Sequence, residues 1–226
     1  MKKYFITVYN IVEKDLLLEL KSKEVVVSML LFSLLVVIVF SFIFEPGAEY
    51  KNDLVGGILW MAFIFSGVLG LNKSMLNETT GGNLNALLLA PVDRSAVFFG
   101  KVVSNFFFLA VMEAITIPIF MIFYNINIFG HSVLSAVVIL MGTYGFSVLG
   151  TLFSLISVKT KTREVMLPLL LLPLIIPIIL AGIQCLNIYI KNGDITESYK
   201  WLKLIGVFDV IFTAVIFAIF DYIVEE

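Results

Sequence analysis

Two carboxylic acids lie inside long apolar segments of the sequence, where a charged group is costly. Glu113 stands in FFFLAVMEAITIPIF and Asp209 in WLKLIGVFDVIFTAV. A charge at the centre of a bilayer costs at least about 2.5–3.5 kcal/mol on insertion scales, so Glu113 is expected to face protein or water. It either faces a substrate or a proton, or it fixes helix packing. Asp209, about two turns into its segment, is predicted to be an interfacial or packing residue.

A pair of carboxylic acids could also perform general acid–base chemistry in an intramembrane enzyme. That alternative requires Glu113 and Asp209 to face one cavity. The sequence contains no other arrangement of this kind, because H-E-x-x-H and G-x-S-x-G motifs are both missing.

The sequence does not predict an ATPase or a metalloprotein. Its Gly100-Lys101 pair has Ser95 where a phosphate-binding loop needs its first glycine, and Val102 follows where Ser or Thr is needed. The single histidine, His131, is expected at the surface of a short outer connector, and Cys185 is the single cysteine. No His-rich or Cys-rich metal site and no internal disulfide can form from these two residues. We predict no catalytic residue, no metal and no directly bound cofactor.

The segments that carry these residues require an apolar solvent. The chain of 226 residues is 60% hydrophobic and 14% charged, whereas soluble domains are about 45–50% apolar and about 25% charged. The excess of apolar residues indicates a lipid environment. The net charge of −2 provides no basic field for nucleic acid.

Six segments are long enough, or nearly so, to cross a bilayer, which takes about 20 apolar residues. They are Val25–Phe44, Leu54–Leu71, Val97–Tyr124, Val133–Val158, Val165–Ile190 and Trp201–Ile223. We therefore predict an all-α integral membrane protein in which residues 1–226 form a single transmembrane permease domain.

The placement of Lys and Arg predicts how these spans are oriented. With the N-terminus in the cytoplasm, eleven Lys and Arg residues fall on the cytoplasmic side and four on the outer side. Positive charge is enriched on the cytoplasmic side of membrane proteins. The pattern predicts a multi-pass protein of the cell inner membrane, with both termini in the cytoplasm.

Residues 1–24, ahead of the first span, are predicted to include an interfacial helix. Residues 4–21 are amphipathic, as is typical of a helix in the headgroup plane. One face holds Asn10, Lys14 and Lys21, and another holds Phe5, Val8, Val12 and Leu16. The alternative is a solvated cytoplasmic helix.

Three prolines, Pro168, Pro173 and Pro177, fall within ten residues of the fifth span. Each removes a backbone donor and disturbs the preceding turn, and the freed carbonyls need partners other than lipid. We predict a kinked span packed against protein, where the kink is either a hinge or a static bend.

The connector Asn72–Ala96 reads NKSMLNETTGGNLNALLLAPVDRSA. Its apolar run, Leu84–Ala90, is too short to span a membrane and too apolar for a free loop, and Pro91 ends it. We predict a short cytoplasmic coupling helix that docks on a soluble partner. Asp93 is expected to cap the next span.

The stretch GNLNALLLAPVDRSAVFFGKVVSN resembles the signature of the haem exporter protein B family, CcmB, which belongs to the ABC-2-type permeases. LVGGILWMAFIFSGVLGLN, TREVMLPLLLLPLIIPIILAG and WLKLIGVFDVIFTAVIFAIFDYIVEE are further matches, and the similarity covers essentially the whole chain. By this resemblance, six residues of the motif would couple the chain to an ATPase: Gly82, Leu84, Leu87, Pro91, Asp93 and Arg94. Asn85 stands where the family usually has an acidic residue, which weakens the case for a salt bridge to the ATPase there but not for docking.

The resemblance also implies partners and a role in cytochrome c maturation. The expected partners are a separate ATP-binding subunit, a tryptophan-rich haem-handling membrane protein and a small single-span protein. Haem is the possible substrate, ATP acts through the partner, and we expect a dimer of this chain with two ATPase subunits. The chain would either move haem or transmit ATP-driven motion that releases a haem-loaded chaperone. A non-transporting scaffold of the same complex is the alternative.

Overall fold

The protein is helical throughout the part of the chain that its computed structural model describes, which is residues 2–43, 51–80, 92–158, 160, 162–191 and 193–225. The elements are α1 (Lys2–Ser22), α2 (Glu24–Ile43), α3 (Lys51–Thr80), α5 (Arg94–Tyr124), the 3-10 turn η1 (Ile128–His131), α6 (Ser132–Val158), α7 (Arg163–Ile190) and α8 (Ile195–Glu225). Helices α2, α3, α5, α6, α7 and α8 are each long and apolar enough to cross a membrane. The predicted all-α membrane fold with six spans is confirmed.

Two of the predicted spans are longer than expected. Helix α3 continues nine residues past Leu71 to Thr80, so the first part of the predicted connector is helical. At 1.5 Å per residue its 30 residues extend about 45 Å, well beyond about 30 Å of hydrocarbon. Polar residues such as Asn72 and Lys73 ended the apolar run in the sequence, but they do not end a helix.

Helix α8 begins at Ile195, six residues before the predicted start at Trp201. Asp194 begins it, because its Oδ1 accepts the backbone N–H of Thr196 at 2.9 Å. That hydrogen bond lowers the pKa of the exposed Asp194. Asp209 consequently lies about four turns into the helix rather than two.

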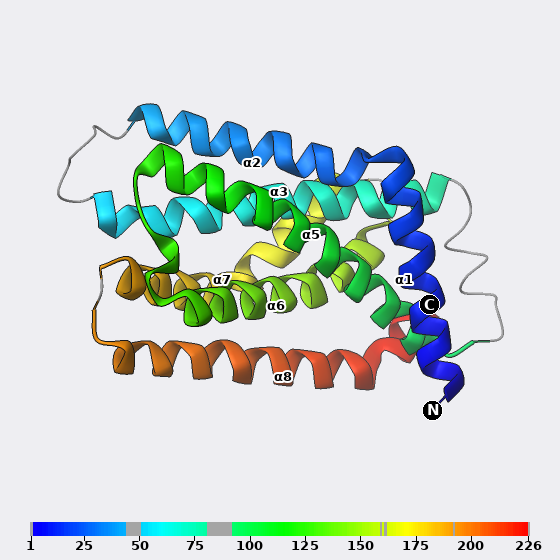
Figure 1. The fold of residues 1–226 in the computed structure, drawn as a ribbon. Coiled ribbons are helices and arrows are strands. Elements are labelled where there is room, and N and C mark those ends of the chain that lie inside the picture. Colours follow the sequence, from blue (N-terminus) through cyan, green and yellow to red (C-terminus); the bar gives the residue numbers. More distant parts are fainter. Residues whose placement is uncertain are drawn as a thin grey trace.

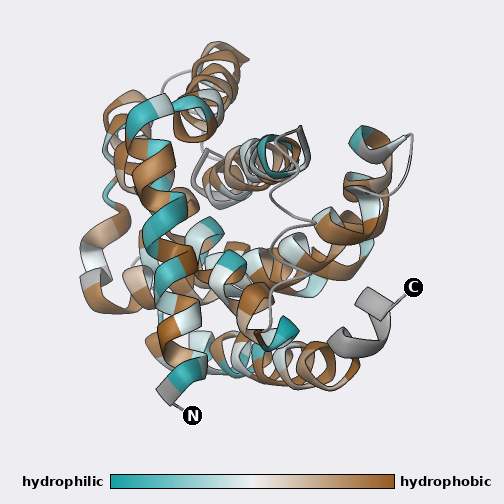
Figure 2. Cartoon of the chain, turned by 90° about the vertical axis from the view of Figure 1, so that its right-hand side faces the viewer, coloured by the Kyte–Doolittle hydropathy of each residue, from teal (hydrophilic) through white to brown (hydrophobic). Residues whose placement is uncertain are grey.

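The helices form a bundle that α1 closes at one end. Figure 1 shows α1 running across the ends of the other helices, beside the end of α3 and the start of α5. It packs mainly on α5. Figure 2 looks onto that end and shows hydrophilic residues on α1, in front of a largely hydrophobic bundle.

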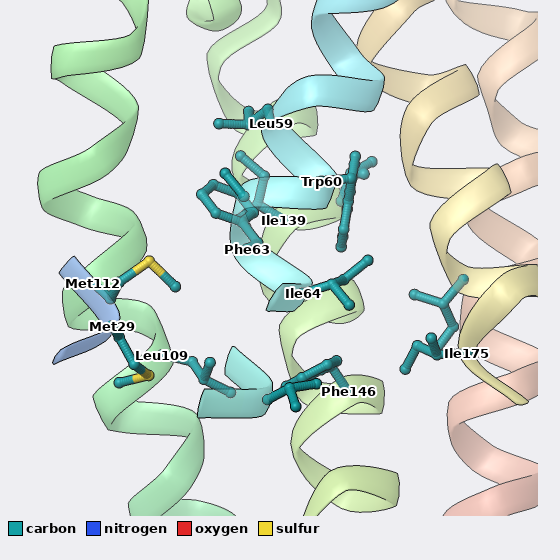
Figure 3. Packing of buried hydrophobic residues seen from close by; sticks show 14 of the residues in the cluster. Met29, Leu59, Trp60, Phe63, Ile64, Leu109, Met112, Ile139, Phe146 and Ile175 are labelled. Atoms are coloured by element: carbon teal, nitrogen blue, oxygen red, sulfur yellow. The ribbon is translucent and has the colours of Figure 1, made fainter. Parts of the chain in front are cut away.

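The core lies around α3. Within the candidate membrane-crossing windows, 72% of α3 is buried but only 11% of α8, so α3 is central and α8 peripheral. Figure 3 shows α3 side chains, including Trp60 and Phe63, between Met112 of α5 and Ile175 of α7. All four of these side chains are buried.

The three prolines of the fifth span lie inside α7, which runs unbroken from Arg163 to Ile190. Helix α7 packs against α3, α6 and α8, as expected for a span with freed carbonyls. Pro173 itself is exposed, whereas Pro168 and Pro177 are half-buried. A hinge role for this span stays a prediction.

Candidate coupling site

The structure describes the helices on both sides of the predicted coupling segment. Gly82, Leu84, Leu87 and Pro91 lie outside the described residues. Helix α3 ends at Thr80 on one side, and Asp93 and Arg94 begin α5 on the other. The structure therefore defines the two helix ends that flank the segment, which we call its roots.

Asp93 occupies the N-cap position of α5, but its side chain makes no capping hydrogen bond. Its backbone carbonyl accepts the N–H groups of Ala96 and Val97 at 3.0 and 3.3 Å. The position of the cap agrees with the prediction, and the predicted side-chain cap is wrong. With φ at −61° and ψ at 124°, the extended backbone at Asp93 lets its carbonyl begin the helix.

A buried ion network joins the two roots of the segment to α1. Lys101 Nζ, on α5, lies 2.8 Å from Asp15 Oδ2 of α1 and 2.6 Å from Glu78 Oε1 of α3. Lys14 Nζ, on α1, lies 2.9 Å from the same Glu78 oxygen and 3.1 Å from Asp15 Oδ1. The ion network, as we call these four residues, contains two lysines and two carboxylic acids, so its formal charges balance.

Burial distinguishes this network from an ordinary surface salt bridge. Lys101 is 2% exposed, and Asp15 and Glu78 are also buried. Surface pairs contribute about 0–1 kcal/mol, whereas removing one partner of a buried pair costs about 3–5 kcal/mol because a charge is left unpaired. Lys101 therefore links α5 to both α1 and α3 through buried ion pairs.

Lys14 lies at the rim of the network, with 37% of its side chain exposed. Burial lowers the pKa of Lys14, but its hydrogen bond to Glu78 and the charges of Asp15 and Glu78 raise that pKa by more. The net shift is upward, so the charged form of Lys14 is stabilised by the two carboxylates.

A glycine lets α1 approach closely enough to make these contacts. A Cβ placed on Gly100 would lie 2.8 Å from Cγ2 of Ile11, too close for any larger residue. Ile11 therefore packs directly on the α5 backbone, and Asp15, one turn later on α1, lies beside Lys101, the residue after Gly100. The Gly-Lys pair that fails as a phosphate-binding loop is the contact point between α1 and α5.

The buried stripe of helix α1 contains two acidic residues, whereas several of its apolar residues are exposed. Ile11, Asp15 and Glu19 follow at four-residue spacing and are all buried. Glu19 Oε1 accepts the backbone N–H of Val26 at 2.8 Å and so caps the start of α2. Phe5, by contrast, is 68% exposed, which suits an interfacial helix better than a solvated one.

Polar contacts continue from the ion network along α5 toward the middle of the bundle. Asn105 Nδ2 donates to Thr151 Oγ1 at 2.9 Å, and the Thr143 hydroxyl lies 2.7 and 2.8 Å from the two Glu113 carboxyl oxygens. The contact residues are eight apart on α5 and eight apart on α6. Two antiparallel helices require this matching spacing, so the two contacts fix one register between α5 and α6.

Glu113 and Asp209 are both buried, at 4% and 8% exposure. Glu113 faces protein, as expected, and lines a cavity of about 10 Å³ beside Trp60 and Thr143, which is about the space of one water molecule. Asp209 lies against Gly145 of α6 and lines a different, larger cavity. These two cavities lend no support to a paired-carboxylate enzyme.

Sequence reasoning missed the ion network, although one signal pointed to it. Lys101 lies four residues inside an apolar segment, in FFGKVVSN, where a charge needs a partner. The sequence alone accounts for Lys101 as half of a Gly-Lys pair and as one charge on the predicted cytoplasmic side. Its partners could not be identified from the pattern, because Asp15 and Glu78 are distant in sequence.

The sequence is similar to known proteins over most of its length. A family model described as "CcmB protein" matches residues 6–223. "Heme exporter protein B" of Rhodobacter capsulatus is 29% identical over 155 residues, covering 69% of this chain and 71% of the relative. Proteins of that name from Haemophilus influenzae and Pseudomonas aeruginosa are each 24% identical over 173 residues, covering 76% of this chain and 77% of the relative.

Proposed function

The chain belongs to the CcmB family, and from this premise we propose that it is the membrane subunit of an ABC-type complex serving c-type cytochrome assembly. The complex exports haem or releases a haem-loaded chaperone, and the name of the relatives, heme exporter protein B, supports the haem substrate. The observation that carries the coupling role is the buried ion network at the roots of the Gly82–Pro91 segment.

In the proposed mechanism, a separate ATPase subunit pushes on the Gly82–Pro91 segment when it closes on ATP. The segment is continuous with α3 and α5, so both helices receive the push. Lys101 links them to each other and to α1, which makes the three helices respond as one unit. The α5 contacts to Thr151 and Thr143 then carry the displacement to α6.

The proposed setting is the cell inner membrane with both termini in the cytoplasm, supported by the asymmetry of Lys and Arg. Two copies of this chain assemble with two ATPase subunits. A haem-handling membrane protein and a small single-span protein complete the complex. ATP is hydrolysed in the ATPase subunit and not in this chain, which has no phosphate-binding loop.

Co-purification of the ATPase tests the docking segment. Replacing Leu84 and Leu87 with Asp should abolish recovery of the ATPase with the tagged chain, because charges replace the apolar contacts. Thr162→Asp, at the exposed N-cap residue of α7, is the control and should leave recovery unchanged. Undiminished ATPase binding by the double variant would exclude docking at this segment.

The scaffold alternative makes a different prediction about ATP. If the chain only holds the complex together, a complex whose ATPase cannot hydrolyse ATP should still support c-type cytochrome assembly. The coupling proposal predicts loss of holocytochrome with the complex intact. Neighbouring reading frames should also encode a P-loop ATPase and a second haem-handling membrane protein.

A further inference from the structure

Two lysines lie on the exposed side of α8, close to the start of the helix. Lys200 and Lys203 are about one turn apart, and both are exposed. Both belong to the segment Ile195–Ile219, which is long and apolar enough to cross a membrane. Figure 1 shows that α8 begins at the end of the bundle opposite α1. The α8 lysine pair, as we call these two residues, is therefore remote from the ion network.

The side of α8 that carries the lysine pair continues as an apolar surface. Leu204, Val207 and Ile211 follow Lys200 at four-, three- and four-residue spacing, which places them on one side of the helix, and all three are exposed. A lysine can extend its apolar stem along such a surface and bring its charged end to the lipid headgroups. The pair therefore marks the level on α8 where the hydrocarbon meets the headgroups.

The acidic residues at this end of α8 do not neutralise the lysine pair. Asp194 accepts the backbone N–H of Thr196, and Glu197 lies in the first turn of α8, where the helix dipole favours a negative charge. Neither lysine forms an ion pair within the described part of the chain. A charge that faces lipid is costly, so the pair requires a counter-charge from outside the chain.

Aromatic side chains beside the pair suit the headgroup level. Lys200 Nζ lies over the ring of Trp201, 5.4 Å from the ring centroid, a distance at which the ring attracts the ammonium group. Tyr199 is exposed on the other side of Lys200. Trp and Tyr are enriched where membrane and water meet. The contact with Trp201 holds the Lys200 ammonium group near the helix surface.

We propose that Lys200 and Lys203 bind the phosphate of an anionic phospholipid. Two ammonium groups one turn apart offer two positive charges to a single headgroup. A free phosphate has the same charge but no acyl chain to cover the apolar surface at Leu204 and Val207, so the lipid fits this side of α8 better. The proposal requires only the bundle in its membrane, so it stands independently of the haem-related function.

Tryptophan fluorescence tests the proposal, because Trp201 contacts Lys200 and the second tryptophan, Trp60, is only 2% exposed. The full chain is placed in phosphatidylcholine vesicles that contain a small fraction of lipid with brominated, quenching acyl chains. This lipid is either phosphatidylglycerol or phosphatidylcholine. The quenching should give phosphatidylglycerol an affinity roughly five- to thirty-fold higher, since each lysine near anionic lipid favours binding by about five-fold.

Variants separate the lysine pair from general effects. Lys200→Gln/Lys203→Gln should remove the preference for phosphatidylglycerol, whereas Lys200→Arg/Lys203→Arg should keep it because the charges remain. Lys21→Gln, which removes an exposed charge on α1, is the control and should also keep it. Soluble glycerol 3-phosphate should not relieve the quenching.

Three results would contradict the proposal. Equal quenching by the two brominated lipids would show that the α8 lysine pair selects no anionic headgroup. A preference that survives the double Gln variant would place the lipid elsewhere on the bundle. Relief of the quenching by glycerol 3-phosphate would indicate a site for free anions rather than for a lipid.

Discussion

The role of Lys101 in the structure differs from the one that its sequence context suggests. In the sequence it completes a Gly-Lys pair and adds one positive charge to the cytoplasmic side. In the structure it bonds to Asp15 and Glu78 from a position that is 2% exposed. Because Lys101 is buried and paired with both carboxylates, we interpret it as a residue that holds the helices of the coupling site together.

Lys101→Met should destabilise the protein by about 3–5 kcal/mol, because the Asp15 and Glu78 carboxylates lose their buried counter-charge. Thermal unfolding in detergent measures the effect. Lys73→Met is the matched control, since Lys73 lies 3.7 Å from the exposed Glu24, and should cost only about 0–1 kcal/mol. Similar losses from both variants would show that the ion network is not special.

Glu113 makes a second residue-scale prediction. Glu113→Gln keeps the shape and an acceptor for Thr143 but removes the carboxyl group. We expect lower c-type cytochrome assembly, measured by haem staining, with the complex still assembled. Thr143→Val, which removes the hydrogen bond, controls for packing. Normal holocytochrome in Glu113→Gln would leave Glu113 with a packing role alone.

Among the elements, α1 differs most from its expected arrangement. The predicted apolar face joined Phe5 with Val8, Val12 and Leu16, but Phe5 is exposed and the other three are half-buried. The buried stripe instead runs through Ile11, Asp15 and Glu19. The helix has a protein side that amphipathic patterning could not reveal, because Asp15 is paired there with Lys101 of α5 and Glu19 accepts a backbone N–H of α2.

Gly100→Leu should displace α1 from α5, because the added side chain would overlap Ile11. Overpacking of this kind costs about 1–3 kcal/mol and should lower the melting temperature. The double variant Gly100→Leu/Ile11→Ala makes room and should recover most of the loss. Failure of Ile11→Ala to rescue the variant would mean that Gly100 is needed for another reason.

For the bundle as a whole, the positive charges predict which end faces the cytoplasm. The distribution of Lys and Arg predicts that α1, the α3–α5 connector and the α6–α7 connector lie inside. The ion network would then lie near the cytoplasmic surface, where an ATPase can push on the adjoining segment.

Labelling of introduced cysteines with a membrane-impermeant maleimide tests this orientation. Asn127→Cys, between α5 and α6, should react in intact cells from the outer side, whereas Thr162→Cys should react only after the membrane is opened. Both residues are exposed, and the native Cys185 is 0% exposed and should stay unlabelled. The opposite labelling pattern would show that the two connectors lie on the opposite sides of the membrane from those predicted. That result would contradict the coupling proposal.

The six spans could be predicted from the sequence, because transfer of each apolar segment from water to lipid depends on composition and length alone. It also contained the family resemblance, which the match over residues 6–223 confirms. The ends of the helices could not be predicted where polar residues continue a helix, as in residues 72–80 of α3. Hydropathy measures whether a residue prefers lipid or water, and it does not indicate where a helix ends.

Which charged residues form ion pairs depends on the tertiary fold. Lys101 and Asp15 are 86 residues apart, and their contact depends on α1 crossing α5 at Gly100, a geometry that no local pattern specifies. The same holds for Glu113 and Asp209, which look alike in the sequence but line different cavities. Burial and pairing are properties of the assembled bundle, because each depends on what the other helices place beside a residue.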